Sequence, residues 1–192
     1  GVVKAVGAGV ATITASYNGQ EVYCSITVFD QYDVETEYVD LGLSVNWATF
    51  NLGANKPEMK GEYFAWGETS PKSVYTQDTY KFNSDSLRKY GDDGKYILDS
   101  EDDAAQVLWG GSWRMPTADE FQELIDNCSW TLTELDGVNG YLVTSKITGY
   151  TDKSIFLPIT GSIRGNTEFN DEGYYWASTM NPDDETSIAD YL

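Results

Sequence analysis

The sequence predicts an α+β protein with short strands, long loops and one or two helices. Three observations indicate this class. The 192 residues include 18 glycines and 14 tyrosines, a composition that favours strands and ordered loops over long helices. Alternating apolar runs lie before and after one amphipathic helical stretch near residue 120. This order of strands, helices and strands is typical of folds with mixed or antiparallel sheets.

The first predicted element is a β-hairpin over residues 11 to 28. Two alternating runs flank Asn18-Gly19, the preferred pair for a type I′ turn because both positions take positive φ. Cys24 lies on the apolar face of this hairpin, together with Val22, Ile26 and Val28. We therefore expect Cys24 to pack in an apolar layer rather than to react or form a bridge.

The opening residues "GVVKAVGAGVATIT" and the hairpin resemble the closing strands of a group 2 bacterial immunoglobulin-like domain. The resemblance covers residues 1–29. A complete immunoglobulin-like sandwich needs about 100 residues and seven strands, so we expect the chain to begin inside such a domain. The charged segment "DQYDVETEYVD" then predicts a linker at residues 30–37, and a second module at residues 38–192.

Two helix starts are predicted in the middle of the chain. Ser100 precedes three acidic residues suited to the positive end of a short helix. Thr117 and Glu120 have the spacing of a capping box. The helix after Thr117 has an apolar stripe made of Phe121, Leu124, Ile125 and Cys128. We therefore expect Cys128 to lie in the core.

Strands are predicted on both sides of the helices. The stretch "YVDLGLSVNWATFNLGANKPEMKGEYFAWGET" indicates short strands joined by long loops. The stretches "TLTELDGVNGYLVTS", "SIFLPITGSI" and "EGYYWAST" indicate later strands separated by turns. Pro158 cannot donate to a ladder, so it favours an edge or a bulge in its strand.

Charge and residue usage exclude several classes of function. The net charge of −19 repels phosphate backbones and anionic lipids, so nucleic acid is not an expected partner. No run approaches the ~18 consecutive apolar residues of a membrane span, so we expect no membrane insertion within this chain. Histidine is absent, which removes Ser-His-Asp and Cys-His catalysis and histidine-ligated zinc or copper.

The second module carries five sequence blocks, in order "EYVDLGLSVNWATFNLGA", "GEYFAWGET", "EDDAA", "WGGSWRMPTADEFQEL" and "GYYWAST". Together they resemble the Fibrobacter-type major paralogous domain, over residues 37 to 179. The resemblance implies a C-type-lectin-like fold, shared with the formylglycine-generating enzyme. It also implies an extracellular or cell-surface protein of gut or rumen Bacteroidetes or their relatives. A shared fold grants no activity by itself.

Two departures from this family matter. Phe50 stands where the family usually has a cysteine, which the resemblance makes the natural partner of Cys128, so that disulfide is not expected. The family also continues to a closing strand with arginine and a glycine-serine pair, and nothing similar follows Thr179. We therefore expect the last strand of the module to be missing.

The stretch "WGGSWRMPTADEF" has the residues that a scaffold requires. Gly110 and Gly111 permit a tight turn, the two tryptophans are large apolar plates, and Thr117 caps a helix. Arg114 can stack on the tryptophans or pair with a carboxylate of "EDDAA". We therefore interpret this stretch as structural, with a ligand site as the alternative.

Acidic residues gather in "GDDGKYILDSEDDAA", and clustered oxygen ligands suit calcium. The spacing matches no EF-hand, so a solvated acidic loop is the preferred interpretation. Calcium is kept as the alternative cofactor, with candidate ligands Asp92, Asp93, Asp99, Asp102 and Asp103.

The resemblance to C-type-lectin-like proteins places a ligand surface on the long loops and the late strand. Aromatic plates with amide and guanidinium donors suit the faces and hydroxyls of a sugar. The candidate residues are Arg164, Asn166, Asn170, Tyr175, Trp176 and Asn181. The alternative is that Trp176 lies in the core and the polar residues decorate a turn.

Together these features predict a non-catalytic binding or adhesion module at a cell surface or outside the cell. Its partner would be a glycan or another protein. A glycoside hydrolase that uses a carboxylate pair, and a purely structural surface module, are the two alternatives.

Overall fold

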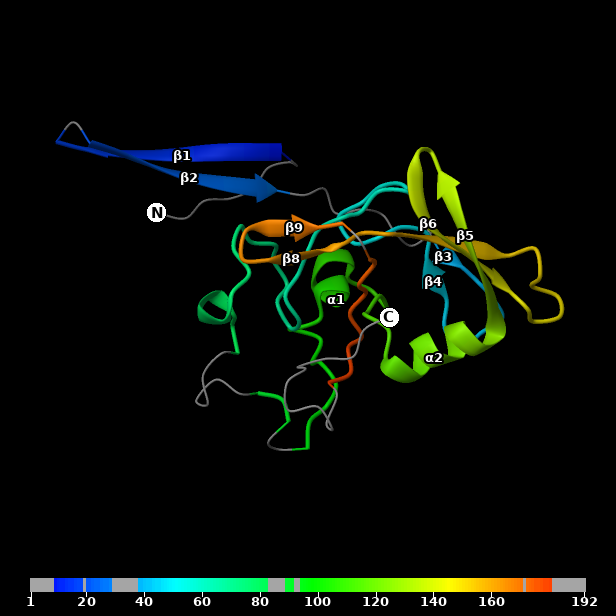
Figure 1. Cartoon of the computed structure of the whole chain (residues 1–192). Helices are drawn as coiled ribbons and strands as arrows, with labels where there is room; N and C mark the ends of the chain where they lie inside the picture. The colour runs from blue at the N-terminus through cyan, green and yellow to red at the C-terminus, as the bar shows by residue number, and fades with distance from the viewer. Residues whose placement is uncertain are drawn as a thin grey trace. The chain divides into compact units, whose positions relative to one another are not determined.

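The structure divides the chain into two units, Gly1–Asp33 and Val34–Leu192, and each is described by itself. This computed structural model describes residues 9–18, 20–28, 38–82, 89–91, 94–170 and 172–180 (Figure 1). Within these residues the strands form one three-stranded sheet and three two-stranded sheets, and the helices are few and short. This composition agrees with the α+β class that the sequence predicts.

The first unit contains the predicted hairpin, built from β1 (Gly9–Tyr17) and β2 (Gln20–Val28). The pairing of Tyr17 with Gln20 leaves a two-residue turn, and Asn18 has the positive φ of 50° that such a turn requires. The expectation for Cys24 is wrong, because its side chain is exposed. Among the described residues of this unit the hairpin has no second layer, and two strands alone cannot bury a face.

The largest sheet of the second unit is antiparallel, in the order β5 (Cys128–Leu135), β6 (Val138–Ser145) and β7 (Ser154–Pro158). A two-residue turn joins β5 to β6, with φ of 48° at Asp136 and 85° at Gly137. Asp-Gly is a preferred sequence for this turn. Pro158 ends β7 on the edge of the sheet, as its missing N–H predicts.

Helix α2 (Ala118–Asn127) begins at the predicted capping box. Thr117 accepts a hydrogen bond from Glu120 N, and Thr117 N donates to Glu120 Oε2 at 2.8 Å. Phe121 and Leu124 are buried as expected, but Ile125 is 42% exposed. The buried side is centred on Phe121, Leu124 and Cys128, so Ile125, one residue past Leu124, is turned about 100° away from it.

The main core lies where α2 packs against the three-stranded sheet. Short strands β3 (Tyr38–Val39) and β4 (Trp47–Ala48) pair beside it, and Trp47 contacts Phe121 with ring centroids 5.6 Å apart. Cys128 is buried in this core as predicted, and burial raises the pKa of its thiol. The buried residues of the main core are Leu41, Trp47, Phe121, Leu124, Cys128, Val143, Ile155 and Ala177.

A second, smaller core is built from residues of the loops before and after helix α1 (Ala104–Trp109). Trp66, Tyr90 and Leu98 are buried there, with Phe82, Met115 and Met180 against them. A short 3₁₀ helix, η2 (Gln77–Thr79), lies in the preceding loop. The prediction that α1 begins at Ser100 is wrong: its N-cap is Asp103, whose carboxylate accepts from Gln106 N at 3.0 Å.

The last described segments are a small hairpin and an extended chain. Strands β8 (Ser162–Arg164) and β9 (Thr167–Phe169) pair antiparallel. The strand predicted at "GYYWAST" is wrong, because residues 173–179 make only isolated bridges, such as Ile97 with Thr179. Ala177 is buried in the main core without joining a sheet, and Tyr175 packs against that core. The prediction of a missing last strand concerns residues 181–192, which lie outside the described ones.

A buried leucine of α2 and an exposed leucine of β5 give a stability test. Leu124 is fully buried, so Leu124→Ala removes contacts that the surrounding core cannot rebuild and should cost about 3 kcal/mol of unfolding free energy. Leu132 on β5 is 61% exposed, so Leu132→Ala should cost under about 1 kcal/mol. Denaturant titration of both variants measures the difference. Equal losses would contradict the placement of this core.

Candidate functional site

The aromatic residues around Trp109 pack against one another. Trp109 and Trp113 lie edge to face with centroids 5.2 Å apart, and Trp109 also contacts Phe50. Gly110 and Gly111 have φ of 70° and 56°, so both need the left-handed freedom of glycine. These contacts are consistent with the structural interpretation.

Arg114 pairs with a different acid from the one expected. Its guanidinium binds the carboxylate of Glu120 in a bidentate ion pair, with Nη1 to Oε2 at 2.8 Å and Nη2 to Oε1 at 2.5 Å. The predicted pairing with "EDDAA" is therefore wrong. Glu120 is already fixed by the capping box, so it offers Arg114 an oriented carboxylate. This pair lowers the pKa of Glu120.

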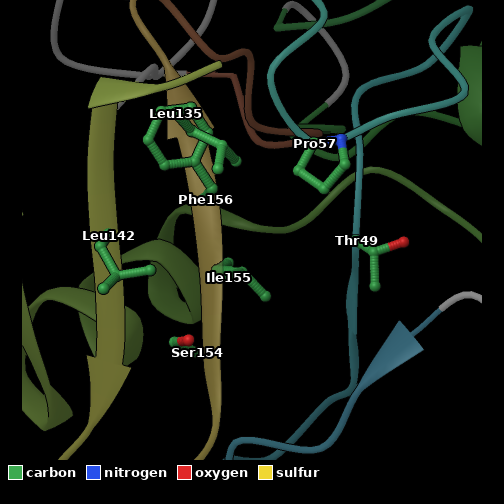
Figure 2. Close-up of a pocket in the computed structure, with 7 residues that line it drawn as sticks. All are labelled: Thr49, Pro57, Leu135, Leu142, Ser154, Ile155 and Phe156. Carbon is green, nitrogen blue, oxygen red and sulfur yellow. The ribbon is translucent and has the colours of Figure 1, made fainter. Parts of the chain in front are cut away.

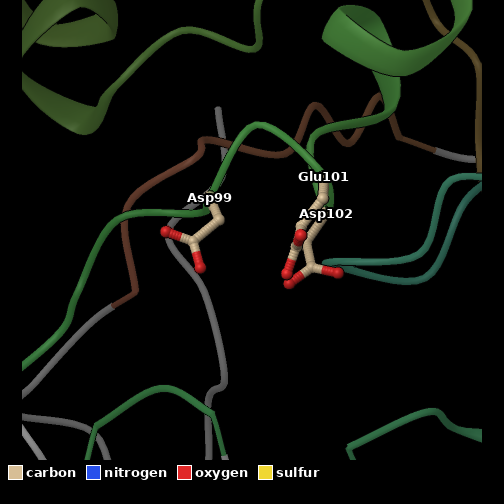
Figure 3. Close-up of side chains that lie close together, drawn as sticks. All are labelled: Asp99, Glu101 and Asp102. Atoms are coloured by element: carbon tan, nitrogen blue, oxygen red, sulfur yellow. The ribbon is translucent and has the colours of Figure 1, made fainter.

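Three carboxylates of the acidic loop converge on one point. Asp99, Glu101 and Asp102 can place one oxygen each within 4.8 Å of the others (Figure 3). The ammonium of Lys89 binds all three, at 2.8 Å from Asp99 Oδ2 and from Asp102 Oδ2, and in direct contact with Glu101 Oε1. A lysine side chain thus supplies the positive charge that this cluster needs.

Asp102 is the buried member of this cluster, with 2% of its surface exposed. Burial alone would raise its pKa, but hydrogen bonds from Lys81, Lys89 and Tyr90 outweigh burial, and its pKa is lowered. Lys81 Nζ lies 2.5 Å from Oδ1, and the Tyr90 hydroxyl donates to Oδ2 at 2.6 Å. Asp102 therefore stays ionised and ties three segments of the loop region together.

The calcium ligands predicted from sequence are only partly brought together. Asp99 and Asp102 meet, while Asp103 is occupied by backbone N–H groups of Gln106 and Met115. Asp92 and Asp93 lie outside the described residues. Calcium takes six to eight oxygens, whereas these carboxylates already share lysine ammonium groups. In the described part of the cluster, lysine therefore balances the carboxylates, and a calcium ion would have to displace it.

The β8–β9 hairpin carries the predicted ligand residues Arg164 and Asn166. Its turn is fixed by two hydrogen bonds of 2.7 Å that Gly165 and Tyr75 exchange through their backbones. Strand alternation puts Ser162, Arg164, Thr167 and Phe169 on one face and Ile163 and Glu168 on the other. Arg164 and Asn166 are both exposed. The hairpin thus presents two chemically different faces.

One face of this hairpin meets a polar network, which we call the Lys60 network: Lys60, Tyr63, Glu168 and Asn170. Lys60 Nζ lies 2.5 Å from both Glu168 Oε1 and Asn170 Oδ1. The Tyr63 hydroxyl is 3.1 Å from Glu168 Oε1 and donates to the carbonyl of Thr160 at 2.5 Å. The hydrogen bond from Lys60, followed by that from Tyr63, lowers the pKa of Glu168.

Tyr175 and Trp176 have opposite environments. The Tyr175 hydroxyl donates to the carbonyl of Pro158 at 2.6 Å, and burial raises its pKa to about 12. Trp176 is 38% exposed, and its Nε1 donates to the carbonyl of Phe64 at 3.0 Å. Tyr175 therefore holds the fold together, while Trp176 offers an oriented indole to solvent. Asn181 lies outside the described residues.

Sequence reasoning missed Lys60, Tyr63 and Glu168. Glu168 lies four residues after Arg164 in the predicted ligand stretch, so that stretch did point to its neighbourhood. Lys60 and Tyr63 are more than 100 residues earlier in the chain. Nothing in a single sequence indicates that such distant residues meet, because the contact depends on how the loops cross.

An apolar pocket of about 170 Å³ lies between the sheet and the loop that contains Pro57 (Figure 2). Strands β5, β6 and β7 supply one wall and the loop supplies the other. Its lining residues are Thr49, Pro57, Leu135, Leu142, Ser154, Ile155 and Phe156. Pockets for drug-sized ligands have about 300–1,000 Å³, so this one admits only a small group.

Comparison with known proteins finds no relative from which a function could be inferred, so the proposal below is based on the geometry of the described residues. No protein-family model matches the chain, and neither a curated protein nor a solved structure is significantly similar to it. Among the described residues no helix is long and apolar enough to cross a membrane.

The acidic cluster gives a pH prediction. The folded-state pKa values of Asp99 and Asp102 lie below the ordinary value of 3.8. Their ionisation therefore stabilises the fold above about pH 3.8, and this contribution is lost as the pH falls through the lowered values. At neutral pH, Asp102→Asn should lower the free energy of unfolding by about 3 kcal/mol. The variant should also lose less of its stability than the wild-type chain as the pH falls. The exposed Asp136→Asn is the control for denaturant titration from pH 7 to 2.5. An unchanged acid profile in Asp102→Asn would contradict this role.

The lysine-filled cluster also gives a metal prediction. We expect about 1 mM calcium, enough for weak extracellular sites, to leave the melting temperature of the wild-type chain unchanged relative to chelator. Calorimetry with and without the ion measures this. A calcium-dependent rise that Asp102→Asn abolishes would show instead that these carboxylates hold the metal.

Proposed function

We propose that the second unit is a non-catalytic binding module of an extracellular or cell-surface protein, with a glycan as its first candidate ligand. The fold would be C-type-lectin-like, as the resemblance to the Fibrobacter-type domain implies. The immunoglobulin-like segment would be part of a spacer that presents the module. A protein ligand at a surface is the second candidate partner.

The exposed indole of Trp176 is the observation that carries this proposal. A tryptophan buries large apolar area when it can, so one that is 38% exposed and fixed in orientation is a suitable platform for a partner. The hydrogen bond to Phe64 fixes the ring without a ligand. A preformed platform lowers the entropy lost on binding.

The Lys60 network supplies polar groups, and its Tyr63 is the sequence neighbour of Phe64, the residue to which Trp176 is hydrogen-bonded. Trp176 is bonded to Phe64, and the adjacent residue, Tyr63, belongs to the network. Carboxylate, ammonium and amide groups held in one arrangement can exchange hydrogen bonds with sugar hydroxyls. Because Lys60 already orients Glu168 and Asn170, little ordering is left to a ligand.

The pKa shifts do not support the alternative of a glycoside hydrolase. That reaction needs one carboxyl group with a raised pKa near a second carboxylate. Among the described residues, every carboxyl group with a resolved pKa shift is shifted downward: Glu21, Asp99, Asp102, Glu120, Asp152 and Glu168. Ionised carboxylates can accept hydrogen bonds but cannot serve as the general acid.

A purely structural module is the remaining alternative. It would need no oriented aromatic side chain on its surface. Binding experiments therefore separate it from the proposal directly.

The test is glycan-array binding of the chain with a substitution at the platform. Trp176→Ala should weaken the binding of glycans by about 5- to 150-fold, if stacking of a sugar on the indole contributes about 1–3 kcal/mol, as stacking of a nucleic-acid base on an aromatic ring does. The matched control is Tyr141→Ala on β6, which removes an aromatic ring of equal exposure, 39%, from another surface.

Two outcomes would count against the proposal. Full signal in Trp176→Ala, or equal loss in both variants, would show that the indole of Trp176 is not the ligand platform. An array without selective signal for the wild-type chain would remove the glycan ligand and favour the structural module.

A further inference from the structure

We propose that Arg164 binds the carboxylate of an acidic sugar, so that the ligand of this module is a uronic-acid glycan. This inference rests on the proposed function, because it names the ligand class of the same binding module, at the hairpin face opposite Glu168.

Arg164 is the one cation to which the described residues offer neither an ion pair nor a side-chain hydrogen bond, and its contact within the protein is with the ring of Phe169. Lys146 and Arg164 alone among the described lysines and arginines lack a carboxylate partner, and Lys146 donates to the carbonyl of Asp126. The partnered cations are Lys56, Lys60, Lys72, Lys81, Lys89, Lys95, Arg114 and Lys153. In a chain with 31 acidic residues, an arginine left without an acid is unexpected. A ligand carboxylate would complete it.

The hairpin holds Arg164 in a position suited to this contact. Its guanidinium carbon lies 5.9 Å from the centre of the Phe169 ring. The backbone of the next residue, Gly165, is fixed by its two hydrogen bonds to Tyr75. Arg164 is exposed, and the N–H edges of a guanidinium match the two oxygens of a carboxylate.

The neighbouring groups favour a sugar acid over a bare anion. Asn166 and Thr167 are exposed in and beside the turn, where their amide and hydroxyl can bond to ring hydroxyls. Phe169 is 44% exposed and offers an apolar face to a sugar ring. The net charge of −19 disfavours densely charged ligands such as sulfated polymers. A sugar with a single carboxylate satisfies all three conditions.

The experiment compares digalacturonate with its dimethyl ester, in which a methyl group on each carboxyl group removes the negative charge and leaves the rest of the sugar unchanged. Calorimetric titration of the wild-type chain should show at least about tenfold tighter binding of the acid, the range expected for charge-assisted hydrogen bonds. Arg164→Ala should remove this preference. Arg164→Lys should restore only part of it, because an ammonium lacks the planar fork. Lys146→Ala removes an equal charge elsewhere and should keep the preference.

The outcomes separate this inference from the proposed function. Equal binding of acid and ester, lost in Trp176→Ala, would overturn the inference and leave the glycan-binding proposal in place. A preference for the acid that persists in Arg164→Ala would also overturn the inference. Absence of binding by both sugars, while the array shows selective binding of other glycans, would overturn the inference alone. An empty array would overturn both.

Discussion

The hydrogen bonds of the extended segment at residues 175–180 are the constraint on which the rest of the second unit depends. Ala177 is fully buried in the main core, while Met180 packs against the smaller one. Between them, Ser178 N donates to the carbonyl of Pro116 at 2.7 Å, and Leu98 N donates to the carbonyl of Ser178 at 3.0 Å. The indole of Trp66 bonds to the carbonyl of Ala177 at 2.9 Å. One segment therefore joins both cores and satisfies its polar groups with loops.

The candidate binding surface follows from this arrangement. Trp176 points outward because its neighbours Tyr175 and Ala177 are committed to the interior. A side chain between two anchored residues has a restricted direction, and the bond to Phe64 restricts it further. The exposed position of Trp176 thus follows from the packing of Tyr175 and Ala177 against the main core. The acidic cluster is likewise completed from within the protein, because Lys89 supplies the positive charge that its three carboxylates require.

Local signals in the sequence predicted local structure well. The capping box at Thr117 and the turn at Asn18 involve residues within a few positions of one another, so the backbone chemistry decides them. The sequence pattern predicted the wrong residue where several neighbouring residues could serve as the N-cap of one helix. Asp103 rather than Ser100 caps α1, because its second oxygen also accepts from Met115 N.

Features that depend on distant contacts could not be predicted. The apolar alternation of "GYYWAST" is the same for a strand and for a buried extended segment, and only the neighbours distinguish the two. Cys24 has a strand pattern, yet its burial depends on a second layer. The Lys60 network was missed because its two halves are over 100 residues apart. The acid-binding role of Lys89 was missed because it needs the intervening loop to turn back.

Hydrogen exchange at the backbone amides of Leu98, Ser178 and Met180 tests the central claim most directly. If residues 175–180 join both cores, these amides should exchange as slowly as those of the central strand β6, and all should respond equally to denaturant because they open only on global unfolding. Fast exchange of Ser178 and Met180 while β6 remains protected would contradict the account. It would show that the segment opens on its own and does not hold Trp176 in place.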